Sequence, residues 1–217
     1  RALHVMACIR LALSNSAVVP KIAWTYKAGG QMKSDPTIDR GTVYIGTDDT
    51  NLYAIGLVDG TLRWKFKTRG KIWAGPTLNE NGTVVYVGSA DHNEYAVKTD
   101  SGVQIWKRAT NAEVMSNPTL SRDNAIVYTG SWDGAMYALR SVDGSLLWKT
   151  QLGGKIGSFS QLTPDGKLLL IGCHDGKVYC VSTGAGQIMW TFETGAQVQS
   201  DQILSANGQI LYIGSDD

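Results

Sequence analysis

The stretch YTGSWDGAMYALRSVDGSLLW, Tyr128–Trp148, contains five residues whose counterparts recur every 42 residues along the chain. They are a glycine, an aspartate, a tyrosine, a second glycine and a tryptophan. In chain order the recurring residues are Gly46, Gly88, Gly130, Gly172 and Gly214; Asp49, Asp91, Asp133, Asp175 and Asp217; Tyr53, Tyr95, Tyr137 and Tyr179; Gly60, Gly102, Gly144 and Gly186; Trp64, Trp106, Trp148 and Trp190. A fixed period of this length indicates a repeat architecture.

Each unit is expected to contain four short strands. In the unit around the quoted stretch they are Ser116–Leu120, Ile126–Ser131, Met136–Arg140 and Leu146–Thr150. Asp-Gly or Asn-Gly pairs separate many of them, and such pairs accept the positive φ of a tight hairpin turn. Four antiparallel strands in about 40–45 residues are typical of a β-propeller blade. The sequence therefore predicts an all-β propeller of four-stranded blades.

Counting the units gives four complete blades, from about Ser34 to Trp190, and the first two strands of a fifth. Two interpretations are open. The chain is an arc of a larger propeller, or the segments KIAWTY (Lys21–Tyr26) and IRLALS (Ile9–Ser14) supply the fourth and third strands of the fifth blade. In the second case Ala12 stands opposite Trp24. We divide the chain into an N-terminal edge segment, residues 1–20, and the propeller repeats, residues 21–217.

The recurring residues have structural explanations. A tryptophan on the outermost strand buries a large area against the next blade. The aspartates recur at one turn of each unit, where we interpret them as caps of the turn backbone and not as a metal-binding cluster. Cys173 and Cys180 lie on opposite arms of one hairpin, and we expect buried free thiols there.

The charge balance argues against nucleic-acid binding. The chain has 20 Lys and Arg and 19 Asp and Glu, for a formal charge of +1, and it lacks the basic surface that nucleic-acid binding needs. No apolar run approaches the 18 or so residues of a membrane span. Val5–Cys8, VMAC, resembles a lipoprotein cleavage box, but no signal core precedes it.

The pattern A-x4-D-G-x3-W identifies a family resemblance. It stands in Ala54–Trp64 and Ala138–Trp148, and it resembles the tryptophan-docking repeat of the pyrroloquinoline-quinone (PQQ) family of propellers. The resemblance covers Trp24 to Asp217. It implies a propeller fold and two functional classes. One comprises quinoprotein dehydrogenases that use PQQ and Ca²⁺. The other comprises non-catalytic members, among them the propeller lipoprotein of the bacterial outer-membrane assembly machinery.

The chain lacks the features that the resemblance implies for an enzyme. It has no adjacent cysteines to stack on a quinone, no Cys-x-x-Cys-His haem segment and no insertions to carry a catalytic Asp or metal ligands. We therefore expect no catalytic, cofactor-binding or metal-binding residues, and a scaffold or accessory subunit that binds protein within a larger assembly. The alternative is a fragment of a PQQ- and Ca-dependent dehydrogenase. The family favours a location in the periplasm, the cell exterior or an organelle lumen.

Positions where the repeats differ are the candidates for binding. Trp132 has no counterpart 42 residues away: the residues before the turn aspartate are Asp48, Ala90, Trp132, His174 and Asp216. The residues at the start of the innermost strand also vary: Lys33, Trp73, Met115, Gly157 and Gln199. We expect Trp73, Met115, Trp132 and His174 to share one propeller face, with Phe159 deeper along the channel. Exposed aromatic and Met side chains anchor protein partners. Alternatively, Trp132 only covers a neighbouring turn.

Overall fold

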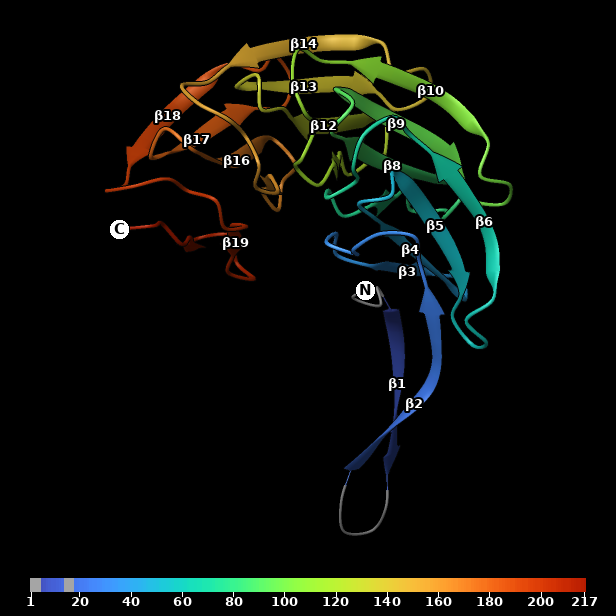
Figure 1. The fold of residues 1–217 in the computed structure, drawn as a ribbon. Helices are drawn as coiled ribbons and strands as arrows, with labels where there is room; N and C mark the ends of the chain where they lie inside the picture. The colour runs from blue at the N-terminus through green and yellow to red at the C-terminus, as the bar shows by residue number, and fades with distance from the viewer. Residues whose placement is uncertain (1–4, 14–17) are drawn as a thin grey trace.

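The computed structural model describes residues 5–13 and 18–217, and strands are the only regular elements in those residues. The strands form antiparallel sheets set side by side in a curved arc (Figure 1). The β1–β2 hairpin lies at one end of the arc and β19–β20 at the other. The expected all-β blade architecture is confirmed.

Four sheets have four strands each, and we number them as blades one to four. Blade one has β3 (Thr37–Asp39), β4 (Thr42–Gly46), β5 (Asn51–Gly56) and β6 (Leu62–Lys67); blade two has β7 (Thr77–Leu78), β8 (Val84–Ser89), β9 (Asn93–Lys98) and β10 (Gln104–Ala109). Blade three has β11 (Thr119–Leu120), β12 (Ile126–Gly130), β13 (Ala135–Arg140) and β14 (Leu146–Gln151); blade four has β15 (Gln161–Leu162), β16 (Leu168–Cys173), β17 (Lys177–Ser182) and β18 (Ile188–Glu193).

Two further sheets have two strands each. They are β1 (Val5–Leu13) with β2 (Val18–Lys27), and β19 (Ile203–Leu204) with β20 (Leu211–Tyr212). Four complete blades and the first two strands of a fifth are therefore present, as expected. The hairpin β1–β2 does not pair with β19–β20 within the chain, so the fifth blade is not completed there.

The innermost strands are shorter than the sequence suggested, and they also bond to the neighbouring blades. The expected strand Ser116–Leu120 is reduced to Thr119–Leu120. Thr77 Oγ1 donates to Pro118 O of blade three at 2.7 Å, and Thr119 Oγ1 donates to Ser160 O of blade four at 2.7 Å. These bonds run around the channel and tie neighbouring blades together.

Tryptophan docking fixes the boundary between successive blades. The indole nitrogens of Trp24, Trp64, Trp106 and Trp148 each donate to a backbone carbonyl of the next blade, at 2.7–2.9 Å. Each ring lies against the glycine of the turn between the third and fourth strands of that blade. A Cβ on that glycine would lie only 2.6–2.9 Å from the ring, so the recurring glycines Gly60, Gly102, Gly144 and Gly186 make room for the indole.

In each of blades one to three, a row of three residues crosses the sheet and supports the tryptophan of that blade. In blade three, Tyr128 on the second strand stands opposite Ala138, which stands opposite Trp148. The small alanine lets the Tyr and Trp rings meet, with their centroids 5.8 Å apart. Blades one and two repeat this row and this separation.

The β1–β2 hairpin reproduces the third and fourth strands of a blade. Cys8 stands opposite Trp24, and the register shifts directly after Cys8, as it does after Ala54, Ala138 and Cys180. Our alignment of Ala12 with Trp24 is therefore wrong, because the connection before β2 is longer than in the other units. Ile9–Ser14 is the segment expected to supply the third strand, and its residue 14 lies outside the described residues.

The β1–β2 hairpin also affects two other predictions, the division of the chain at residue 20 and the resemblance of VMAC to a lipoprotein cleavage box. Because β2 begins at Val18, it crosses our division at residue 20. Residues 1–4 and 14–17 of the N-terminal segment lie outside the described residues, and this division stays a prediction. Cys8 pairs within a strand and packs against the core of blade one, which does not favour the lipoprotein-box interpretation of VMAC.

The recurring aspartates cap their turns as expected. Asp91 Oδ1 accepts the backbone N–H of Asn93 at 3.2 Å, and its Oδ2 accepts the hydroxyl of Tyr95 at 2.7 Å. The same Oδ2 accepts the backbone N–H of Arg69, in the loop that enters the blade, at 2.8 Å. Asp133 repeats all three bonds. These carboxylates are thus structural.

Candidate functional site

The variable positions follow one another along one face of the arc. In each unit the residue before the turn aspartate donates its backbone N–H to the loop that enters the innermost strand, at 2.8–3.1 Å. The pairs are Asp48 with Gln31, Ala90 with Lys71, Trp132 with Glu113, His174 with Lys155 and Asp216 with Gln197. Each acceptor precedes a variable start position by two residues. The two sets of variable residues are therefore neighbours, as the sequence predicted.

Trp73 is held in a charged cluster. Its indole nitrogen donates to Asp48 of blade one. The Nζ atoms of Lys33 and Lys71 lie 4.5 and 5.2 Å from the centre of its ring. Both ammonium groups also approach the Asp48 carboxylate, at 4.0 and 3.9 Å. The ring is half-buried, and these contacts fix its orientation.

Trp132 and His174 meet across Gly157. The Nε1 atom of Trp132 and the Nε2 atom of His174 each lie 3.4 Å from the place where a Cβ on Gly157 would stand. Lys155 covers the other side of the indole, with Nζ 4.3 Å from the ring centre. The indole nitrogen is buried and has no hydrogen-bond partner. Gly157 leaves the space in which the two side chains approach each other.

Burial and the neighbouring Lys155 favour the neutral form of His174. Partial burial and the ammonium of Lys155 lower the pKa of His174, against an opposing effect of Asp216. A lowered pKa favours the neutral imidazole, which can donate one hydrogen bond and accept another.

Met115 and Phe159 occupy the same inner region. Met115 follows two residues after Glu113, whose carbonyl accepts the backbone N–H of Trp132. The backbone N–H of Phe159 donates to Asp201 Oδ1 of the next unit at 2.8 Å. Both side chains are half-buried, like those of Trp73, Trp132 and His174. The five side chains are therefore partly accessible to solvent.

Two lysines of this face were not predicted from the sequence. Lys71 and Lys155 stand two residues before Trp73 and Gly157, at equivalent positions of their units. The 42-residue period could have found them, because Gln31, Glu113 and Gln197 at the same repeat position also vary. The period does not predict that these lysines lie over tryptophan rings, because that depends on the path of the loops between blades.

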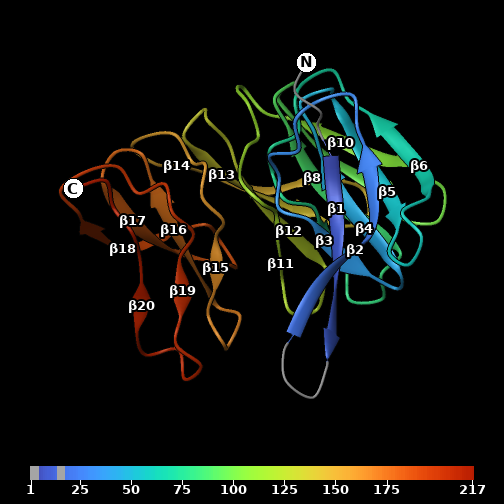
Figure 2. The same ribbon diagram turned by 60° about the horizontal axis from the view of Figure 1, so that its bottom comes forward.

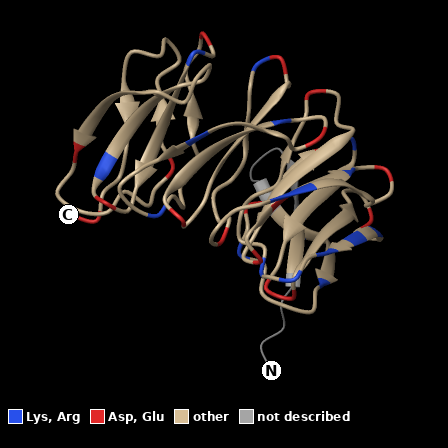
Figure 3. Cartoon of the chain, turned by 90° about the horizontal axis from the view of Figure 1, so that it is seen from above, with Lys and Arg blue, Asp and Glu red and all other residues tan. Residues whose placement is uncertain are grey.

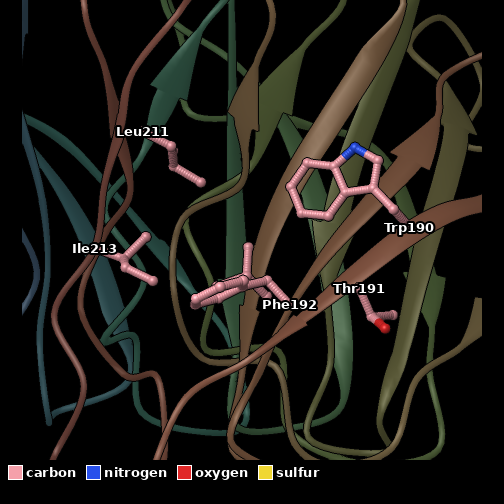
Figure 4. Close-up of a pocket in the computed structure, with 6 residues that line it drawn as sticks. Trp190, Thr191, Phe192, Leu211 and Ile213 are labelled. Carbon is pink, nitrogen blue, oxygen red and sulfur yellow. The ribbon is translucent and has the colours of Figure 1, made fainter.

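A second apolar surface lies at the end of the arc that carries β19–β20. A hollow of about 570 Å³ opens between β18 and β20. Figure 4 shows Trp190 and Phe192 on one side of it and Leu211 and Ile213 on the other. Trp190 is 45% exposed, whereas the equivalent Trp106 is 6% exposed. Among residues 5–13 and 18–217, no glycine packs against the Trp190 ring as Gly144 packs against Trp106.

The cysteines do not fit a quinone site. Cys173 and Cys180 are free thiols buried in blade four, as we expected, and Cys8 is in the β1–β2 hairpin. Burial raises the pKa of Cys173 to about 12. The three cysteines are distributed over separate positions of the blades, so they offer no adjacent pair for a cofactor ring. Among residues 5–13 and 18–217, no group of three or more His, Cys, Asp and Glu side chains is placed to hold a metal ion.

Charged residues of both signs are interspersed over the loops and outer strands (Figure 3). Within the described part of the chain, no helix has the length and apolar character needed to cross a membrane. The mixed surface agrees with the near-neutral composition. In Figure 2, the hairpins β1–β2 and β19–β20 lie apart and form separate sheets.

Comparison with known proteins identifies relatives of this architecture. A family model described as outer membrane protein assembly factor BamB matches residues 16–79 and 58–211. The crystal structure of BamB from Moraxella catarrhalis is similar, with a TM-score of 0.73 and 19% sequence identity over 92% of this chain and 69% of that chain. At this identity the similarity concerns the fold. The search of curated proteins gave no match. The matched ranges cover most of the sequence, and the chain belongs to the BamB-like family of PQQ-repeat β-propellers.

Proposed function

We propose that the chain is a non-catalytic propeller that binds a protein partner through the face containing Trp73, Met115, Trp132, Phe159 and His174. The observation that carries this proposal is the contrast between the repeats. Residues that dock blades recur at fixed spacing, whereas the neighbouring positions on this face differ from unit to unit. Side chains that vary on a constant frame are available for recognition.

The geometry of the face supports a role in protein binding. Trp73 and Trp132 are held by cation–π contacts with Lys33, Lys71 and Lys155, so their rings are ordered before a partner arrives. A preorganised aromatic side chain loses little entropy on binding. Tryptophans of this kind are frequent hot spots of protein interfaces.

Family membership suggests the process in which this binding takes place. BamB is described as an outer membrane protein assembly factor. We propose that this chain acts outside the cytoplasm as a subunit of such an assembly. The chain lacks the cysteine pair and the acidic ligands that the resemblance implies for a quinoprotein dehydrogenase. Incubation with PQQ and Ca²⁺ followed by a dye-linked alcohol oxidation assay tests this alternative, and turnover would contradict our proposal.

The proposed role is tested by complementation. The chain, exported by an added signal peptide, is expressed in a bacterium whose own BamB-type propeller has been deleted, and the amount of folded outer membrane protein is measured. We expect the chain to raise that amount and the double variant Trp73→Ala/Trp132→Ala to lose the effect. Val58→Ala/Val142→Ala is the matched control, because both valines are exposed and lie on outer turns.

Three outcomes separate the parts of this proposal. Loss of the effect in the tryptophan variant alone supports both the function and the face. Equal activity of both variants contradicts the binding face. No effect of the unaltered chain, when it is present and folded in the periplasm, contradicts the role in outer membrane protein assembly.

A further inference from the structure

The indole of Trp132 has a buried donor without an acceptor. Its Nε1 atom is shielded from solvent and forms no hydrogen bond with any residue that the structure describes. An unpaired buried N–H destabilises the folded state, and such groups are rare in native proteins. Because the ring belongs to the proposed binding face, the missing acceptor can be supplied by a partner.

A complete version of this arrangement stands at the boundary between blades one and two. The indole nitrogen of Trp73 donates to the carboxylate of Asp48. The Nζ atom of Lys71 lies 5.2 Å from the centre of the Trp73 ring and 3.9 Å from the same carboxylate. An indole N–H and an ammonium group together hold one carboxylate at this boundary.

The cluster around Trp132 has the same two donors and lacks the carboxylate. Lys155 stands at the repeat position of Lys71, and its Nζ atom lies 4.3 Å from the centre of the Trp132 ring. His174 stands at the repeat position of Asp48, so an imidazole replaces the acid. In the part of the chain that the structure describes, no ion pair includes the Lys155 ammonium.

The two rings approach each other at a place that a ligand can reach. Trp132 Nε1 and His174 Nε2 each lie 3.4 Å from the place where a Cβ on Gly157 would stand. Lys155 is exposed and His174 is partly exposed. Exposed side chains change rotamer rapidly, so these two side chains can move as a ligand enters.

We propose that Trp132, Lys155 and His174 form a receptor for an acidic side chain of the protein partner. The partner's carboxylate accepts the Trp132 Nε1–H and pairs with the Lys155 ammonium, as Asp48 does in the cluster around Trp73. Hydrogen bonds to an ionised group are stronger than those between neutral groups, and the imidazole can donate a further one. The example within the chain is a side-chain carboxylate, which favours an Asp or Glu of the partner over a C-terminus. This inference rests on the proposed binding face and specifies the chemistry of what binds there.

A peptide titration followed by NMR tests the receptor. The probes are a tripeptide with a central glutamate and both ends blocked, the same peptide with glutamine, and a triglycine whose only carboxylate is its C-terminus. The indole N–H signals of the isotope-labelled chain are recorded, and that of Trp132 is identified by its loss in Trp132→Phe. We expect the glutamate peptide, at millimolar concentration, to move the Trp132 signal downfield in a saturable manner. The Trp73 signal should stay in place, because Asp48 already accepts that N–H.

Three variants define the contacts. Lys155→Gln removes the ammonium and is expected to weaken binding of the glutamate peptide at least about fivefold, because the charged partner is lost. Lys71→Gln is the matched control, since this lysine lies at the same repeat position beside a tryptophan that already has its acceptor, and binding should be unchanged. Gly157→Asp places a carboxylate of the chain itself beside Trp132 Nε1. Its Trp132 signal should lie downfield without peptide and no longer respond to it.

The contrary outcomes are distinct. No shift of the Trp132 signal with the glutamate peptide, an equal shift with the glutamine peptide, or unchanged binding in Lys155→Gln overturns the proposal. A response to the C-terminal carboxylate alone overturns the assignment to an acidic side chain. Equal shifts of the Trp132 and Trp73 signals are a general effect of salt and also overturn it. A chain that passes the complementation test but does not respond to the peptide keeps the proposed function and loses only this inference.

Discussion

Glu94 is a charged side chain at a core position. It is fully buried on β9 between blades two and three, and the equivalent residues are Leu52, Met136 and Val178. One carboxyl oxygen accepts the hydroxyl of Thr129 at 3.0 Å, and the other has no partner. Burial raises the pKa of Glu94 from 4.5 to about 8. The carboxyl is therefore largely protonated in the folded chain at pH 7.

Glu94 makes stability depend on pH. Below pH 4.5 both the folded and the unfolded chain are protonated at this residue. Between pH 4.5 and about 8 the folded chain keeps a proton that the unfolded chain releases, so the free energy of unfolding falls as pH rises. We expect Glu94→Leu to stabilise the chain at pH 8 by a few kcal/mol more than at pH 5, at about 1.4 kcal/mol per pKa unit. Urea unfolding at the two pH values measures this, and an equal effect at both would contradict it.

The docking tryptophans are chemically alike but differ in burial. Trp106 is 6% exposed and bonds to Ser141 O, whereas Trp190 is 45% exposed. We expect Trp106→Ala to lower the free energy of unfolding by about 3–5 kcal/mol, the usual cost of removing a buried Trp. Trp190→Ala should cost less than half as much. Urea denaturation of both variants tests the difference, and equal losses would show that Trp190 is packed like the others.

The observed strands and turns agree closely with those predicted from the sequence wherever a unit has its full set of recurring residues. The second, third and fourth strands of blade three begin and end within one residue of the expected positions. The expected fourth strand Lys21–Tyr26 lies within β2, but the third strand was placed too late in the sequence, because Trp24 was the single recurring residue of the hairpin and a Cys replaces the alanine opposite it. The innermost strands were predicted too long, since the local pattern does not show where their backbone pairing begins.

The candidate face was predictable in part. Variation between repeats indicated Trp73, Trp132 and His174, and the loop bonds place them on one face. Lys71 and Lys155, which lie over the tryptophan rings, were not predicted, because cation–π contacts depend on tertiary distances of about 4–5 Å. The half-buried state of the rings depends on the same contacts.

The turn between the third and fourth strands controls the contact between blades. Gly144 has a φ of +69°, and a Cβ there would lie 2.7 Å from the ring of Trp106. We expect Gly144→Ala to destabilise the chain by more than the 1 kcal/mol typical of backbone strain alone, as judged by thermal unfolding. Gly184→Ala is the matched control, since a Cβ there meets nothing within 4 Å. A comparable loss in the control would contradict this explanation.

At the scale of the whole molecule, the repeats form an arc of blades, and the buried side chains pack each blade against the next. Family membership and the similarity to BamB agree with this arrangement. The residues that vary are gathered on one face. We therefore assign stability to the recurring residues and propose that recognition depends on the variable ones.

The most direct test of that assignment is the free energy of unfolding of Trp73→Ala/Trp132→Ala, measured in urea beside Trp106→Ala. The two variable tryptophans are half-buried. They contact ammonium groups, and Trp73 also bonds to Asp48; cation–π contacts at exposed sites contribute about 0.5–1 kcal/mol each. We predict that the double variant loses no more than about 2 kcal/mol and remains folded, less than Trp106→Ala alone. A loss in the double variant that equals or exceeds that of Trp106→Ala would place both tryptophans in the core and contradict the binding face.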